Sequence, residues 1–126
     1  MKRVITAVVF AVFAVAVCWL GRALTEKHVE EISDTMAQID SLLEEGDTEQ
    51  ALELSRSFLN EWESIHGQLC LFLQHEHLDP LESVFAVLPY YIEQGEISLA
   101  RSECRLVQTT TDHILKTERV TIENIL

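Results

Sequence analysis

An apolar run near the N-terminus constrains this chain more than any other feature. The 18 residues VITAVVFAVFAVAVCWLG (4–21) include a single polar side chain. As a helix they would be about 27 Å long, close to the roughly 30 Å thickness of a membrane's hydrocarbon core. Trp19 lies where interfacial aromatic residues are common, and three basic residues that can reach lipid headgroups flank the run: Lys2, Arg3 and Arg22. We expect residues 1–23 to form a transmembrane anchor that meets the membrane through residues 4–21.

A cleaved signal peptide is the alternative interpretation. Lys2 and Arg3 precede the run, and the small residues of GRA (21–23) suit a cleavage site. However, the run is longer than the usual signal-peptide core of about 7–15 residues, and a helical pattern continues beyond it. A lipoprotein site at Cys18 is disfavoured, because Val17 precedes it where a small residue is needed. The pattern favours a retained anchor.

The charge distribution bears on orientation and on partners. Between Glu26 and Ala100 there are 17 acidic residues and two basic ones. An anionic cytoplasmic leaflet would repel such a domain. The distribution of basic residues around the anchor also favours an N-terminus on the cytoplasmic side. We therefore expect the N-terminus inside the cell and an extracytoplasmic domain. Nucleic acid is not an expected partner, because phosphate contacts need a basic surface. The acidic surface mainly favours solubility, with a basic partner or bound cations as alternatives.

Beyond the anchor, apolar residues recur at helical spacing. The first stripe contains no Gly or Pro, so we expect the anchor helix to continue into it as a stalk. Together the stripes predict an all-α fold, an antiparallel bundle of helical hairpins formed by an acidic domain of residues 24–126. The expected helices span residues 24–45, 47–76, 80–94 and 96–125.

Two junctions between these helices resemble each other. GDTEQA (46–51) and GEISLA (95–100) both read Gly, acid, three residues and Ala. In each, the Gly is expected to end one helix, the acid to begin the next, and the Ala to let two helices approach closely. Similar corners occur in tetratricopeptide repeats. The chain has only two such units at the wrong period, so we expect repeat-like corners rather than a peptide-binding solenoid.

The stretch QHEHLDP (74–80) concentrates polar side chains between two predicted helices. Residues two apart on a helix point about 200° apart, so one metal ion could not easily bind both His75 and His77. Asp79 with the following proline is a strong signal for a helix start. We interpret the stretch as a structural joint, and we predict no metal, cofactor or catalytic residue there. Sensing of pH by the two histidines stays an alternative.

Three other charged residues are functional candidates. Glu118 falls in line with the apolar stripe of the last helix, where a carboxylate buried against Trp62 or a histidine could serve a site. More often such a residue is paired or partly exposed. Arg101 and Arg105 would suit a partner that carries carboxylates, but they more simply neutralise the acidic helices of the domain itself.

The cysteines and the order of reactive residues bear on enzymatic function. Cys70 and Cys104 fit either buried small hydrophobic residues or one disulfide. No order of residues in the sequence suggests a nucleophile of the Ser–His–Asp or Cys–His kind, and no Gly-rich loop follows a strand. We therefore do not expect an enzyme.

Several short stretches are similar to a known family. They are Trp62, FLQHEHLDPLE, YIEQGE and ERVTIENIL, downstream of the N-terminal span. They resemble a family of small membrane-anchored proteins of Gram-positive, mostly clostridial, bacteria that is catalogued only as a domain of unknown function. The resemblance implies a single-pass all-α protein without an assigned activity, and it transfers no catalytic residue. The matching positions are Trp62, His75, Leu78, Asp79, Gly95, Glu118, Asn124, Ile125 and Leu126.

These features favour a non-enzymatic, membrane-tethered helical interaction module of the cell membrane that binds a membrane or envelope protein. The candidate interaction or structural positions are Trp62, His75, His77, Asp79, Glu118 and Asn124. The alternative is an extracytoplasmic sensor of a small ligand, a cation or pH. It would use the acidic face together with His75, His77 or Glu118. The oligomeric state is left open.

Overall fold

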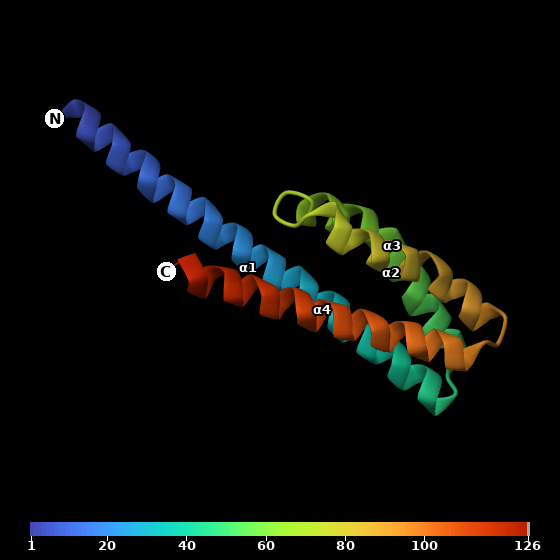
Figure 1. Cartoon of the computed structure of the whole chain (residues 1–126). Helices are drawn as coiled ribbons and strands as arrows, with labels where there is room; N and C mark the ends of the chain where they lie inside the picture. The colour runs from blue at the N-terminus through green and yellow to red at the C-terminus, as the bar shows by residue number, and fades with distance from the viewer. Residues whose placement is uncertain (126) are drawn as a thin grey trace.

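The computed structural model describes residues 1–125, apart from the side chains of Glu118 and of residues 120–125. Its four helices confirm the predicted all-α fold, and the described residues include no strand. The helices are α1 (Lys2–Glu45), α2 (Thr48–Leu69), α3 (His75–Glu93) and α4 (Ile97–Ile125) (Figure 1).

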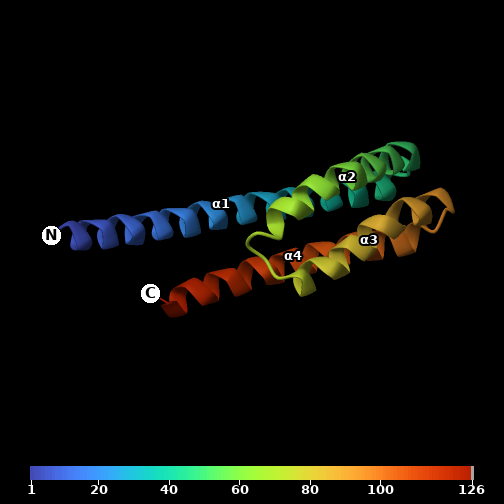
Figure 2. The same ribbon diagram turned by 90° about the horizontal axis from the view of Figure 1, so that it is seen from above.

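The helices form an antiparallel bundle in which each packs against two neighbours. α1 contacts α2 and α4, and α3 contacts the same two helices. The N-terminal half of α1 projects alone from one end of the bundle, which we call the proximal end (Figures 1 and 2). The α2–α3 loop and the C-terminal end of α4 also lie at the proximal end. The α1–α2 and α3–α4 turns lie at the other, distal end.

α1 has two halves of different character. Residues 1–20 are all exposed, and by length and composition this half could cross a membrane, a criterion that a signal sequence also meets. From Gly21 onwards a buried stripe recurs every three or four residues: Gly21, Thr25, Val29, Ile32, Met36, Ile39 and Leu43. One unbroken helix therefore carries both the apolar segment and a wall of the core.

Both distal turns follow the expected corner chemistry. Gly46 and Gly95 have φ of 85° and 76°, the left-handed conformation that glycine adopts at little cost. The Asp47 carboxylate accepts a hydrogen bond of 3.2 Å from the Gln50 N–H at the start of α2. Ala51 and Ala100 are completely buried, so helices approach closely at both corners. The predicted stops and starts are confirmed here.

The predicted boundary between the second and third helices is wrong. α2 ends at Leu69 rather than near residue 76, and α3 begins at His75 with Gln74 at its N-cap position. Asp79 is therefore not a helix cap, and α3 continues through two prolines. The reason is burial. Ending α2 early lets Leu73 and Leu78 both enter the core, and full burial of a leucine is worth about 1.5–3 kcal/mol, more than the roughly 1 kcal/mol of a capping residue.

Candidate functional site

Three side chains converge beside the proximal loop, and each carries an atom able to bind a metal. They are His66, Cys70 and His75, whose ligand atoms all lie within 4.8 Å of one another. The Cys70 Sγ lies 3.7 Å from Nδ1 and 3.5 Å from Nε2 of His66, and 3.8 Å from Nδ1 of His75. His66 and Cys70 are half-buried, and His75 is exposed.

The end of α2 and the start of α3 position this cluster. His66 and Cys70 are one helical turn apart, and the Cys70 N–H donates to the His66 carbonyl over 2.9 Å. The chain then reverses, held by the buried Leu69 and Leu73, whose backbones are joined by a 2.8 Å hydrogen bond. The reversal returns His75, the first residue of α3, to the face that carries His66 and Cys70.

Aromatic packing supports the cluster from the core side. Trp62 is buried, and its ring centroid lies 5.5 Å from that of His66 and 4.7 Å from that of Phe85. The His66 and His75 rings are 6.1 Å apart. Trp62 is thus a core residue whose ring packs against the His66 imidazole from the core side. It is not an exposed contact for a partner.

The other candidates predicted from the sequence are not part of the cluster that the structure describes. His77 and Asp79 are exposed residues of the first turns of α3, and neither belongs to the cluster. The Asp79 carbonyl accepts a 3.2 Å hydrogen bond from the Ser83 hydroxyl, as an ordinary helical residue does. The side chains of Glu118 and Asn124 lie outside the described residues.

Part of the cluster could have been predicted from a pair of different ligand residues, a histidine and a cysteine, one helical turn apart. His66 and Cys70 have the i, i+4 spacing that places two ligands on one helix face. His75 could not have been added, because on the single helix predicted through residue 76 it would have pointed about 140° away from Cys70.

A close contact joins the loop to α1 beside the cluster. The ring of Phe72 packs against Gly21 so tightly that a Cβ on Gly21 would lie 2.2 Å from the ring's Cε1 atom. Leu71, at the tip of the same loop, is 76% exposed, and Phe72 is 42% exposed. Apolar loop side chains therefore lie at the level where the apolar half of α1 ends.

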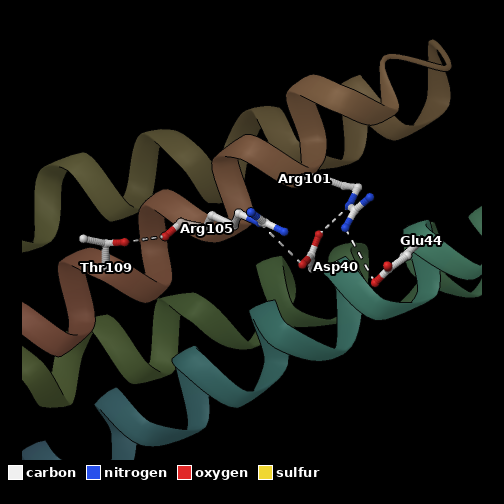
Figure 3. A network of polar contacts seen from close by, with 5 residues as sticks. All are labelled: Asp40, Glu44, Arg101, Arg105 and Thr109. Atoms are coloured by element: carbon white, nitrogen blue, oxygen red, sulfur yellow. Dashed lines mark hydrogen bonds and ion pairs between the residues drawn. The ribbon is translucent and has the colours of Figure 1, made fainter.

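An ionic network links α1 to α4 along the bundle (Figure 3). The Arg101 Nε donates to the Asp40 carboxylate over 2.7 Å, and its guanidinium lies 3.6 Å from Glu44. Arg105 approaches Asp40 at 3.9 Å, and its carbonyl accepts a 3.0 Å hydrogen bond from Thr109. The expectation that these arginines neutralise the domain's own acidic helices is confirmed.

The three cysteines are all free in this structure. Cys104 is completely buried in the core, and burial, aided by nearby Asp40 and Glu103, raises the pKa of its thiol to about 12. Cys104 is therefore a small hydrophobic residue rather than half of a disulfide, and Cys70 is the half-buried thiol of the candidate site.

The comparisons with known proteins identify a family but no activity. A family model described as a domain of unknown function (DUF4363) matches residues 20–125. No curated protein and no solved structure matches the chain. The bacterial origin that the sequence resemblance implies stays a prediction.

Proposed function

We propose that this chain, which belongs to the DUF4363 family, is a non-enzymatic helical module held at a membrane by its N-terminal helix, where it binds another membrane or envelope protein. The observation that carries the proposal is the continuity of α1. Residues 1–20 leave an apolar helix uncovered, and the same helix forms part of the core from Gly21 onwards. No flexible linker separates the two halves.

This continuity determines what the module can do. A bundle on a flexible linker could sample a large volume, whereas a bundle on an unbroken helix is held at a fixed height above the bilayer. A fixed height suits recognition of another protein anchored in the same membrane. The exposed loop residues Leu71 and Phe72, next to Gly21, support a bundle seated directly on the bilayer, because their apolar side chains would leave water there.

The charge pattern supports an orientation for the module. The basic residues before the apolar segment favour an N-terminus on the cytoplasmic side. The acidic domain would then lie outside the cell, away from the anionic cytoplasmic leaflet. Its surface would favour a partner with complementary basic residues.

Crosslinking in the native membrane tests the proposal. The tagged full-length chain is crosslinked in whole cells alongside two control variants. One lacks residues 1–23, and the other has residues 4–20 replaced by an unrelated apolar span of equal length. We expect one dominant partner, recovered also when that partner carries the tag. Capture should survive the exchanged span and disappear without a span. Crosslinks between copies of this chain alone would overturn the interaction proposal.

Cation sensing is the second candidate function. The observation that favours it is the convergence of His66, Cys70 and His75 at the proximal end. Cation sensing does not depend on the identity of a protein partner, and cation binding can be tested separately.

A further inference from the structure

We infer that His66, Cys70 and His75 form a zinc-binding site, an inference that goes beyond the proposed interaction function. The site lies where α2 ends and α3 begins, so one bound ion would join two helices across the proximal loop. Three protein ligands leave the fourth tetrahedral position to water or to a donor from a partner.

The spacing of the ligand atoms suits a tetrahedral ion. Zn–S bonds of about 2.3 Å and Zn–N bonds of about 2.0–2.1 Å place sulfur and nitrogen roughly 3.6 Å apart at a tetrahedral angle. The Cys70 Sγ lies 3.5 Å from the nearer His66 nitrogen and 3.8 Å from the His75 nitrogen. The ligand atoms of the cluster lie within 4.8 Å of one another, whereas two zinc-bound nitrogens lie roughly 3.4 Å apart at a tetrahedral angle. Zinc binding therefore requires the imidazoles to turn toward the ion, and the exposed side chain of His75 has the freedom to do so.

Hydrogen bonding would hold this arrangement only weakly. A thiol is a weak donor and its sulfur a weak acceptor, so Cys70 can donate to one imidazole and accept from the other only through weak bonds. Both rings nevertheless lie within 4 Å of the same sulfur atom. A cation between them would be bound by all three groups at once, with the Cys70 thiol releasing its proton as a thiolate forms.

The donor set selects the metal. One thiolate and two imidazoles favour zinc and its transition-metal neighbours over Mg²⁺ and Ca²⁺, which prefer oxygen ligands. The acidic residues elsewhere on the bundle offer only oxygen, so an excess of Mg²⁺ would occupy them without competing at the cluster. This difference separates the site from loosely held ions on the acidic surface.

The site would also fix the proximal loop. Leu71 and Phe72 lie between the ligands Cys70 and His75 in the chain, and Phe72 rests on Gly21 of α1. Closing this short segment with an ion would restrict the loop beside the apolar segment of α1. Zinc would thereby stabilise the part of the bundle nearest to the proposed membrane surface.

Zinc and cobalt titrations of the purified full-length protein in detergent micelles, with excess Mg²⁺ present, test the site. Competition with a chromophoric chelator gives the stoichiometry of Zn²⁺, and Co²⁺ reports thiolate coordination through its charge-transfer absorption. We expect one tightly bound Zn²⁺ per chain, the cobalt–thiolate absorption, and protection of Cys70 from alkylation by zinc. The variants Cys70→Ser, His66→Gln and His75→Gln should each lose stoichiometric binding.

Matched controls keep this test decisive. His77→Gln removes an exposed imidazole two residues from a proposed ligand, and Cys18→Ser removes a thiol from the apolar segment. Both should bind zinc as the unchanged protein does. His75→Gln alters an exposed side chain, so it remains informative if Cys70→Ser fails to fold. No stoichiometric zinc, equal loss in the controls, or binding of Cu⁺ in place of zinc would each overturn the zinc site.

Discussion

The contact between Gly21 and Phe72 shows how one missing side chain joins the loop to the long helix. Alanine is favoured over glycine inside a helix by about 1 kcal/mol, so glycine at this position has a cost that the contact must offset. The ring of Phe72 occupies the space that a Cβ at Gly21 would need. In contrast, nothing lies within 4 Å of a Cβ built on Gly67, which is in the last turn of α2.

This comparison predicts different outcomes for the same substitution at two sites. Gly67→Ala should raise the free energy of unfolding by up to about 0.5 kcal/mol, because Gly67 lies in the last turn of α2, where the preference for alanine is weaker than in the middle of a helix. Gly21→Ala should gain less or lose, because Phe72 must swing away from α1. Urea unfolding of the full-length protein in a mild detergent measures both. In a Phe72→Ala background, Gly21→Ala should become more stabilising than it is in the unchanged protein. The same effect of Gly21→Ala in both backgrounds would show that the contact is unimportant.

The buried thiol of Cys104 gives a second prediction at the residue scale. Its pKa of about 12 leaves almost no thiolate near neutral pH, and the thiolate is the reactive form. A maleimide should therefore modify Cys70 in the metal-free native protein and leave Cys104 unmodified until the chain is unfolded. Mass spectrometry of the labelled peptides with and without denaturant measures this. Comparable native labelling of the two residues would contradict the burial of Cys104.

The ion pairs between helices differ in how much they stabilise the fold, according to their exposure. Arg101 and Asp40 join α4 to α1 over 2.7 Å, with 30% and 16% of their side chains exposed. Arg56 and Glu93 join α2 to α3 over a shorter 2.6 Å, but about half of each side chain is exposed. Water and salt weaken the exposed pair, and a short distance alone does not make an ion pair stabilising.

We therefore predict that the longer but less exposed pair, Arg101 and Asp40, contributes more to stability than Arg56 and Glu93. Arg101→Ala should lower the free energy of unfolding by more than Arg56→Ala, which should change it by less than about 0.5 kcal/mol. The same urea experiment, repeated at high salt, measures both variants. The Arg56 effect should vanish in salt, and part of the Arg101 effect should persist. A larger loss for Arg56→Ala would contradict the assignment.

The element boundaries show what could be predicted from the sequence and what could not. The distal corners depend on local chemistry, because a left-handed Gly46 followed by a capping Asp47 ends one helix and starts the next without help from the rest of the fold. The α2–α3 boundary depends on tertiary burial of Leu73 and Leu78. A strong local signal at Asp79 was overridden there.

The same dependence limited prediction of the candidate site. Two of its ligands, His66 and Cys70, share one helix face and could have been found from their spacing alone. The third, His75, reaches them only because α2 ends early. A site built across a turn requires the position of that turn, which the core determines.

At the scale of the whole molecule, the proximal end brings together the features that bear on function. The apolar half of α1, the exposed loop and the histidine–cysteine cluster all lie there, while the distal end consists of two capped turns (Figure 2). The 17 acidic residues between Glu26 and Ala100 begin where the apolar segment has ended. A bundle with this polarity has one end suited to a bilayer and a body suited to water.

This polarity predicts different surroundings for two exposed leucines. Leu71, 76% exposed, lies at the proximal end, and Leu99, 47% exposed, lies near the start of α4 at the distal end. In a Cys18→Ser, Cys70→Ser background, Leu71→Cys and Leu99→Cys each offer one reactive thiol for a polarity-sensitive fluorophore, because Cys104 is buried. In lipid vesicles, the probe at position 71 should emit as in an apolar medium and be quenched by spin-labelled lipids. The probe at position 99 should report water. If both report water, the bundle does not rest on the bilayer, and α1 instead holds it away from the surface as a stalk.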